Sequence, residues 1–221
     1  MSKFSSISLA LALLVLFLAA AWIGGHGNSI DVRIVEALAM VREAYPWITP
    51  IAAAITQLGS AGATLTASAL ACLWLCLKRA PRSALLLGVA VAFGRIVDDV
   101  LKVLIARVRP PIDLHAVSVS SASFPSGHAA NSMAAYLLIA LIAFPGRVRL
   151  PAVVCAILLS VVIGLTRPIL GVHWPSDVIG GWVLALAMVW SSMVIGRRFK
   201  LIPLEPQHQI VRRHRLPLDQ D

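Results

Sequence analysis

The sequence has 221 residues, of which 59% are hydrophobic and only 13% are charged, and its formal net charge is +9. This composition is too apolar for an ordinary soluble globular domain and indicates a membrane protein. The basic residues lie mostly between and after long apolar stretches, so we interpret them as the charge that orients a membrane protein and expect no nucleic-acid partner.

Six apolar stretches of the size that crosses a bilayer follow one another along the chain. A helix needs about 20 mostly apolar residues to cross the hydrocarbon core. The candidate spans cover approximately residues 7–23, 61–77, 83–106, 128–144, 150–165 and 177–195. No repeat or second domain is visible. The sequence therefore predicts a single all-α membrane helix bundle over residues 1–221, with about six transmembrane helices.

The first stretch has two interpretations. Lys3 before it and the small residues at 19–21 are also typical of a signal peptide, but the apolar run is long for one, and a retained helix is favoured. Residues 31–47 then place charged and apolar side chains at helical spacing, which indicates a helix on the membrane surface. The apolar piece 48–58 either joins the second span or forms a short re-entrant segment.

The distribution of Lys and Arg predicts the orientation in the membrane. With the N-terminus inside, the inner segments carry twelve basic residues: Lys3, Lys78, Arg79, Arg82, Arg147, Arg149, Arg197, Arg198, Lys200, Arg212, Arg213 and Arg215. The outer segments carry five: Arg33, Arg42, Arg107, Arg109 and Arg167. Basic residues accumulate on the cytoplasmic side, so both termini are expected in the cytoplasm. The basic tail, about residues 197–221, would rest on anionic lipid of the inner leaflet.

Charged residues within the third stretch indicate a function, because a charge inside a membrane helix is costly. We interpret Arg95, Asp98 and Asp99 as an ion-pair cluster that faces the bundle interior. Lys102 lies near the outer end of this stretch, seven residues before Arg109, so a continuous helix would place both cations on one face. The two prolines after Arg109 would end that helix.

The three cysteines have a plainer interpretation. Cys72, Cys76 and Cys155 fall inside apolar stretches and lack the spacing of a zinc site. Although Cys72 and Cys76 share a helical face, packing is favoured over a redox or metal pair.

A polar segment precedes the fourth apolar stretch. Ser126 can cap the helix that begins there, and Gly127 lets a ligand approach the N–H groups at the positive helix end. His128 would lie in the first turn. Taken alone, this segment could also be a helix cap with a surface histidine.

The last outer loop supplies a second histidine and a carboxylate. Asp177 follows His173 by four residues and could hold one imidazole nitrogen, although it could equally be the N-cap or first-turn acid of the last helix. Arg167 adds a third outer cation beside Lys102 and Arg109. Three cations with converging N–H groups suit a phosphoryl group, whose transition state spreads negative charge over its oxygens.

These segments together resemble the type 2 phosphatidic acid phosphatase superfamily, which also contains vanadium haloperoxidases and bacterial acid phosphatases. The resemblance is strong over about residues 101–181, with Thr166 in place of the serine that usually opens the third motif. The three motifs correspond to Lys102-x6-Arg109-Pro110, Pro125-Ser126-Gly127-His128 and Arg167-x5-His173-x3-Asp177.

The resemblance implies a lipid phosphatase with a phosphohistidine intermediate. It assigns His173 as the nucleophile, Asp177 as the carboxylate that orients it, and His128 as the general acid for the leaving alcohol. No metal or other cofactor is implied. The residues expected to hold the phosphoryl oxygens are Lys102, Arg109, Ser126, Gly127 and Arg167.

The expected substrate is a phosphate attached to a lipid, because the site would lie at the outer, periplasmic face of a bacterial inner membrane. Undecaprenyl diphosphate ranks slightly ahead of phosphatidylglycerophosphate, phosphatidic acid and lipid A phosphates. A lipid phosphotransferase with the same phosphohistidine is one alternative, and a transporter is another. A haloperoxidase is disfavoured because those relatives are soluble.

Overall fold

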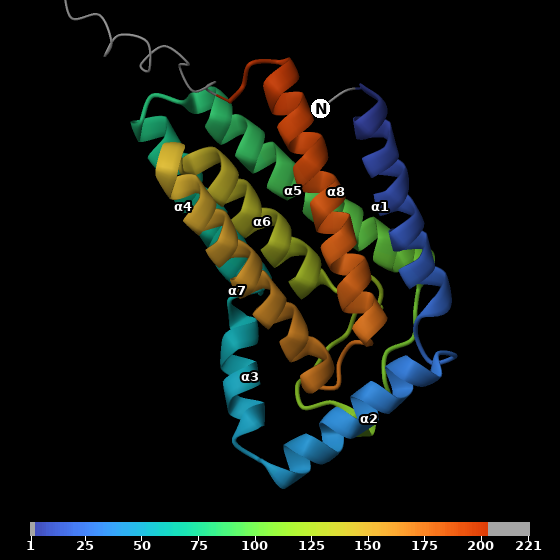
Figure 1. Ribbon diagram of the computed structural model, residues 1–221. Coiled ribbons are helices and arrows are strands. Elements are labelled where there is room, and N and C mark those ends of the chain that lie inside the picture. The colour runs from blue at the N-terminus through green and yellow to red at the C-terminus, as the bar shows by residue number, and fades with distance from the viewer. Residues whose placement is uncertain (1–2, 203–221) are drawn as a thin grey trace, which may run out of the picture.

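The computed structural model describes residues 3–202, and these residues form an all-helical bundle (Figure 1). The predicted basic tail lies, from residue 203 on, outside the described residues. The α-helices of the described chain are α1 (Lys3–Ile23), α2 (Ser29–Ala44), α3 (Ile48–Gln57), α4 (Ala61–Leu77), α5 (Pro81–Ile105), α6 (Gly127–Ala143), α7 (Arg149–Ile169) and α8 (Pro175–Arg198). Two short 3₁₀ turns, Ile112–Leu114 and Gly146–Val148, complete the described elements.

The six predicted spans correspond to α1 and to α4 through α8, and the predicted surface helix corresponds to α2. Within residues 3–202, three helical segments are long and apolar enough to cross a membrane: Ile48–Leu77, Gly146–Ile169 and Pro175–Arg198. Two shorter apolar helices are Ser8–Ile23 and Gly127–Ala143. The prediction of an all-α membrane helix bundle is confirmed.

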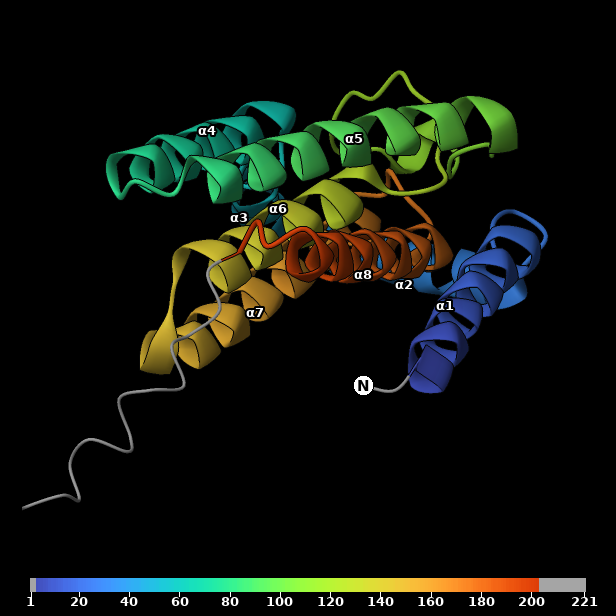
Figure 2. The ribbon, with the colours of Figure 1, turned by 90° about the horizontal axis from the view of Figure 1, so that it is seen from above.

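Helix α6 lies at the centre of the bundle. It packs against α4 and α5 on one side and against α7 and α8 on the other, as the view from above shows (Figure 2). Its sequence is rich in alanine, and most of its residues are buried. Small side chains let helices approach closely, and van der Waals packing of this kind is a main source of helix association in membranes.

Helix α2 crosses the end of the bundle at which α7 ends and α8 begins (Figure 1). Its N-cap is Asn28, whose side chain accepts hydrogen bonds from the amides of Ile30 and Asp31. Asp31 is buried, and its carboxylate accepts hydrogen bonds from the Gly25 amide and from the Ser176 amide and hydroxyl. The turn between α1 and α2 is thereby attached to the start of α8.

Two glycines of α8 let the loop before α6 pack directly on that helix. A Cβ atom at Gly180 would lie 2.4 Å from the Phe124 ring, and one at Gly181 would lie 2.8 Å from the Ser126 carbonyl oxygen. Real Cβ atoms do not make contacts this short. The Gly-Gly pair therefore fixes how closely Ser126 approaches the start of α8.

Helix α5 ends earlier than predicted. Ala106 has a positive φ of 47° and its amide donates to the Lys102 carbonyl, which closes the helix in a left-handed C-cap. The expectation of a helix that continues to Arg109 and stops at the prolines is therefore wrong. Lys102 lies in the last turn of α5 and Arg109 in the following loop.

The predicted charge cluster of α5 is only partly internal. Asp98 is buried and forms an ion pair with Lys102 at 3.2 Å. Asp99 is exposed and Arg95 is half-buried, and no ion pair joins them in the described part of the chain. The expectation that both face the interior with Asp98 is wrong for Asp99.

The cysteines are free thiols, as the packing interpretation expected. Cys72 packs against the core, and its thiol donates to the Ala84 carbonyl of α5 at 3.4 Å, whereas Cys76 and Cys155 are exposed.

Candidate active site

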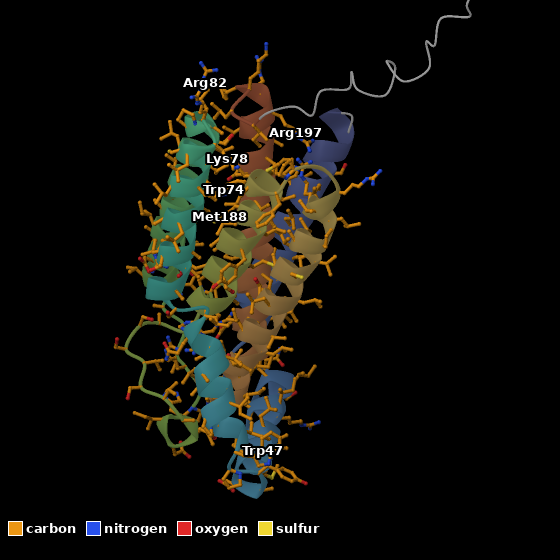
Figure 3. All side chains as sticks on the ribbon, turned by 90° about the vertical axis from the view of Figure 1, so that its left-hand side faces the viewer. Trp47, Trp74, Lys78, Arg82, Met188 and Arg197 are labelled. Carbon is orange, nitrogen blue, oxygen red and sulfur yellow. The ribbon has the colours of Figure 1, made fainter. Side chains whose placement is uncertain are left out.

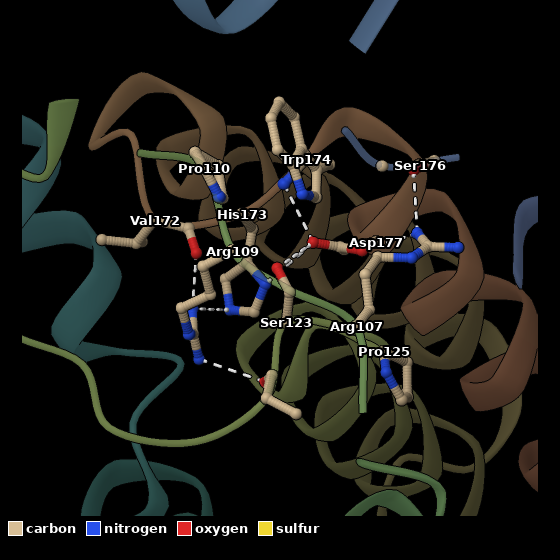
Figure 4. A network of polar contacts seen from close by, with 12 residues as sticks. Arg107, Arg109, Pro110, Ser123, Pro125, Val172, His173, Trp174, Ser176 and Asp177 are labelled. Carbon is tan, nitrogen blue, oxygen red and sulfur yellow. Dashed lines mark hydrogen bonds and ion pairs between the residues drawn. The ribbon is translucent and has the colours of Figure 1, made fainter. Parts of the chain in front are cut away.

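Three chain segments meet at the end of the bundle covered by α2. They are the end of α5 with the loop after it, the start of α6, and the connection between α7 and α8 (Figure 4). A backbone hydrogen bond joins the start of α6 to the start of α8, since the Ser126 amide donates to the Asp177 carbonyl at 3.0 Å. Another closes the loop after α5 on itself, since the Ser123 amide donates to the Arg107 carbonyl at 2.9 Å.

His173 lies in the connection between α7 and α8 and is almost fully buried, with 2% of its surface exposed. Its Nδ1 is 3.4 Å from Asp177 Oδ2, and its Nε2 is 3.2 Å from Arg109 Nη1 (Figure 4). Burial lowers the pKa of the imidazole from its usual value of 6.5 to about 4, although the hydrogen bond to Asp177 acts in the opposite direction. The ring is therefore neutral at neutral pH, and a proton on Nδ1 directed at Asp177 leaves the lone pair on Nε2.

Asp177 is fully buried in the first turn of α8 and is held through both carboxylate oxygens. Oδ2 accepts hydrogen bonds from the Ser123 hydroxyl at 2.5 Å and from the Trp174 amide at 2.9 Å. Oδ1 accepts from Arg107 at 2.8 Å. Asp177 is thus the first-turn acid of the last helix and also lies beside the His173 ring.

Arg107 was missed by the sequence analysis as a site residue. Besides its ion pair with Asp177, it donates to the Ser176 hydroxyl at 3.1 Å and to the Ala20 and Ala21 carbonyls at the end of α1. Its guanidinium also lies over the Phe124 ring, 4.3 Å from the centroid. The sequence did offer one indication of Arg107: it is an arginine in a predicted outer segment, where basic residues are few.

Arg109 spans the gap between the loop after α5 and the loop of His173. Its side chain donates to the Ser121 carbonyl at 2.7 Å, to the Ala122 carbonyl at 3.3 Å and to the Val172 carbonyl. These contacts hold the Arg109 guanidinium beside His173 Nε2. A phosphoryl oxygen bound there would accept the hydrogen bond of Arg109 in place of the Nε2 lone pair.

Lys102 is fixed between the carboxylate of Asp98 and the Pro125 carbonyl. Gly127 makes this arrangement possible, because a Cβ atom there would lie 2.8 Å from Asp98 Oδ2 and 3.5 Å from Lys102 Nζ. The start of α6 can therefore pack directly on the Asp98–Lys102 ion pair. This places a cation beside the first N–H groups of a helix, where an anion is favoured.

Two buried polar groups at the site have no hydrogen-bond partner among the described residues. They are Ser126 Oγ and Arg167 Nε. The expectation that the Ser126 side chain caps α6 is wrong, because Ser126 occupies the N-cap position without a side-chain hydrogen bond. Arg167 donates instead through Nη1 to the Thr56 hydroxyl at 2.8 Å, and the neighbouring Thr166 hydroxyl donates to the Ile163 carbonyl at 2.6 Å.

His128 is the second residue of α6 and is half-buried. The turn between α3 and α4 covers it, since a Cβ atom at Gly59 would lie 3.2 Å from its Cδ2 atom. The positive charges of Arg167, Lys102 and Arg109 all act on its imidazole. No described residue forms a hydrogen bond with this ring, so its nitrogens are available to a substrate oxygen.

The structure thus brings all eight predicted site residues to one end of the bundle: Lys102, Arg109, Ser126, Gly127, His128, Arg167, His173 and Asp177. Within residues 3–202, no group of three or more His, Cys, Asp or Glu side chains is arranged to hold a metal ion.

Comparisons with known proteins point to one family. A family model described as the PAP2 superfamily matches residues 83–200, which include all three motifs. Phosphatidylglycerophosphatase B of Bacillus subtilis is 32% identical over 184 residues, which cover 81% of this chain and 89% of that protein. Lipid A 1-phosphatase of Rhizobium etli is 37% identical over 131 residues, 51% of this chain and 52% of that protein. A crystal structure of a transmembrane PAP2 type phosphatidylglycerolphosphate phosphatase from Bacillus subtilis matches with a TM-score of 0.75 and 30% identity, over 87% of this chain and 96% of that one.

Proposed function

Because this chain belongs to the PAP2 superfamily, whose model matches it over residues 83–200, we propose that it dephosphorylates a membrane lipid through a phosphohistidine on His173. The family and the relatives make the chain a membrane phosphatase. One observation supports the mechanism above the others. A buried neutral imidazole, oriented by a carboxylate, lies beside cations and beside two buried polar groups that lack partners.

The phosphoryl group would bind among Lys102, Arg109 and Arg167. A buried polar group without a partner costs about 1–3 kcal/mol, and phosphate oxygens would supply the acceptors that Arg167 Nε and Ser126 Oγ lack. The Gly127 amide at the start of α6 would donate to a third oxygen. The three cations would balance the charge that spreads over these oxygens in the transition state.

Phosphoryl transfer would then run in two steps. The lone pair on His173 Nε2 forms the N–P bond as the P–O bond to the leaving group breaks, and His128 donates its proton to the leaving oxygen. Asp177 stabilises the positive charge that develops on the His173 ring. A water molecule, deprotonated by His128, next attacks phosphorus, the N–P bond breaks, and its electron pair returns to His173.

The substrate that we propose first is a glycerophospholipid phosphate such as phosphatidylglycerophosphate. Phosphatidylglycerophosphatase B of Bacillus subtilis, which matches 81% of this chain, carries that activity in its name, and so does a crystal structure that matches 87% of it. Undecaprenyl diphosphate, which the sequence ranked slightly ahead, becomes the second candidate, followed by phosphatidic acid and lipid A phosphates.

The site would face the periplasm, with both termini in the cytoplasm. The end of the bundle opposite to His173 carries Lys78, Arg82 and Arg197, whereas Trp47 lies at the site end (Figure 3). Basic residues accumulate at the cytoplasmic ends of membrane helices, so this arrangement supports an outward-facing site in an inner membrane.

Phosphate release by purified protein tests the proposal. Wild type, His173→Ala and a control, His26→Ala, are compared in detergent on phosphatidylglycerophosphate, undecaprenyl diphosphate, phosphatidic acid and a lipid A phosphate, with and without EDTA. His26 is exposed on the turn between α1 and α2. We expect release by wild type and the control alone, unchanged by EDTA, with the fastest rate on phosphatidylglycerophosphate. Release by His173→Ala at the wild-type rate contradicts the proposal, and a phosphoenzyme that releases phosphate only to an added lipid acceptor indicates a phosphotransferase.

A further inference from the structure

A second group of cations surrounds a cavity at the end of the bundle opposite to His173. The cavity has a volume of about 360 Å³, and Arg79 from the α4–α5 turn and Arg82 from the first turn of α5 line it together with Lys200 after α8. The Ser83 hydroxyl joins the two segments by donating to the Leu201 carbonyl at 2.7 Å. No carboxylate lines this cavity, and none pairs with the three cations in the described chain.

The backbone supports the same arrangement on both sides of the cavity. Arg79 and Lys200 directly follow the C-caps of α4 and α8 and have positive φ angles of 59° and 53°. The next amides close these helix ends by donating to the Leu75 and Gly196 carbonyls. Two helix ends from distant parts of the chain thus place positively charged residues at one cavity.

An apolar groove lies between α5 and α8, and its nearest lining residues, Leu86 and Ile195, are three and five positions along the chain from Ser83 and Lys200 of the cavity. It has a volume of about 350 Å³, and Leu86, Val89 and Phe93 of α5 line one side of it while Met188, Ser192 and Ile195 of α8 line the other. Arg82 lies on the α5 face of Leu86, Val89 and Phe93, one turn before Leu86. Figure 3 shows Arg82 and Arg197 at this end of the molecule and Met188 further along the bundle.

The cavity and the groove together match one leaflet of a bilayer in length. From Arg82 at the cavity to Phe93 in the groove, α5 rises by about 16 Å at about 1.5 Å per residue. The hydrocarbon core of a bilayer is about 30 Å thick, so the two together reach from the membrane surface to about its midplane. The cations would lie at headgroup level and the apolar lining at the level of the acyl chain.

We propose that the cavity and the groove together bind one anionic phospholipid of the leaflet opposite to the active site, with its phosphate among Arg79, Arg82 and Lys200 and one acyl chain between α5 and α8. Three cations without a carboxylate select a negatively charged headgroup over a zwitterionic one. The groove selects a lipid over free phosphate, which would occupy the cavity alone.

This site is distinct from the proposed active site and does not depend on the reaction there. Arg82 and Lys102 are separated by about 30 Å along α5, so a lipid bound at one site does not reach the other. The bound lipid would connect the ends of α5 and α8, the helices that carry Lys102 and Asp177 at their other ends. We therefore expect it to stabilise the bundle.

Thermal unfolding of the full-length, delipidated protein in detergent tests this inference. Adding dioleoyl phosphatidylglycerol at saturation should raise the Tm of wild type by about 5 °C more than dioleoyl phosphatidylcholine does. The double variant Arg82→Gln/Lys200→Gln should lose most of this difference. The control Arg147→Gln, an exposed arginine at the same end of the bundle but outside the cavity, should keep it.

A second variant tests the groove and leaves the three cations in place, so it tests the proposal even if the double variant does not fold. Ala90→Phe fills the space beside Phe93, so the effect of phosphatidylglycerol should fall, and Arg82→Lys should keep it. An equal rise with phosphatidylcholine, a rise that survives in the double variant, or an equal rise with inorganic phosphate alone overturns the proposal.

Discussion

The guanidinium of Arg107 donates a hydrogen bond to Asp177 Oδ1 over 2.8 Å, between residues that are 70 positions apart in the chain. The same side chain donates to the Ala20 and Ala21 carbonyls at the end of α1. Asp177 in turn faces His173. The first helix is thereby attached to the carboxylate beside the proposed nucleophile, and α1 helps to hold that carboxylate in place.

Replacing Arg107 should lower kcat with little change in KM. In Arg107→Gln the Asp177 carboxylate loses the one cation that pairs with it in the described structure, because the His173 ring is neutral, and its orientation loosens. Loss of such a supporting contact typically costs about 10- to 100-fold in activity. The measurement is steady-state kinetics on a lipid phosphate, with Arg33→Gln on the exposed face of α2 as the control. A wild-type kcat in Arg107→Gln contradicts this role.

Replacing His128 should slow the hydrolysis of substrates with poor leaving groups more than that of substrates with good ones. If His128 protonates the leaving oxygen, His128→Ala loses about 100- to 10,000-fold on a lipid phosphate, because an alkoxide is a poor leaving group. p-Nitrophenyl phosphate needs no such proton, so its hydrolysis should fall far less. Equal losses on both substrates are incompatible with a general acid at this position.

The acidic limb of the pH profile should lie near 4. Burial lowers the pKa of His173 to about 4, and the nucleophile must be neutral. Activity is therefore retained as the pH falls through 6.5, the usual value for histidine, and is lost only as the pH falls through about 4. The measurement is kcat/KM against pH, with unfolding followed in parallel.

Asp177→Asn supplies the comparison for that profile, because the ionisation of the substrate is the same for both enzymes. The Asp177 carboxylate raises the pKa of His173, so its removal should move the limb to lower pH while kcat falls. An acidic limb near pH 6.5 in both proteins would contradict the assignment of His173 as the titrating group.

A methyl group at position 127 should disturb the site through Asp98 and Lys102. In Gly127→Ala the new Cβ would lie 2.8 Å from Asp98 Oδ2, so the ion pair must shift. Overpacking of this kind costs about 1–3 kcal/mol of stability, and displacement of Lys102 should lower activity as well. Gly62→Ala is the matched control, because only the Ser60 hydroxyl comes within 4.0 Å of its Cβ position. Equal Tm and activity in both variants contradict the packing argument.

Much of the fold was predictable because long apolar stretches identify membrane helices in a sequence. The predicted stretch 61–77 coincides with α4, and the predicted 128–144 differs from α6 by one residue at each end. Boundaries set by local backbone conformation were less accessible. The left-handed Ala106 that ends α5 follows no pattern that the sequence shows, and the prolines suggested a later end.

The candidate site was predicted to the extent that short-range motifs encode it. His173 and Asp177 are four residues apart, so the spacing itself places the carboxylate within reach of the ring. Arg107 and Ser123 contact Asp177 from 70 and 54 positions away, and tertiary packing alone creates those contacts. The same packing leaves the Ser126 hydroxyl without a partner among the described residues, whereas the local sequence predicted that it caps α6.

The most direct test of the central claim is to identify the phosphorylated residue. Wild type, His128→Ala and His173→Ala are mixed briefly with radiolabelled phosphatidylglycerophosphate, quenched in alkali and digested, and the labelled peptide is sequenced by mass spectrometry. We predict an alkali-stable, acid-labile phosphate on His173 in wild type, much less of it in His128→Ala after the same brief mixing because the leaving oxygen is no longer protonated, and none in His173→Ala. Label on another residue, or rapid hydrolysis by His173→Ala, would contradict the account.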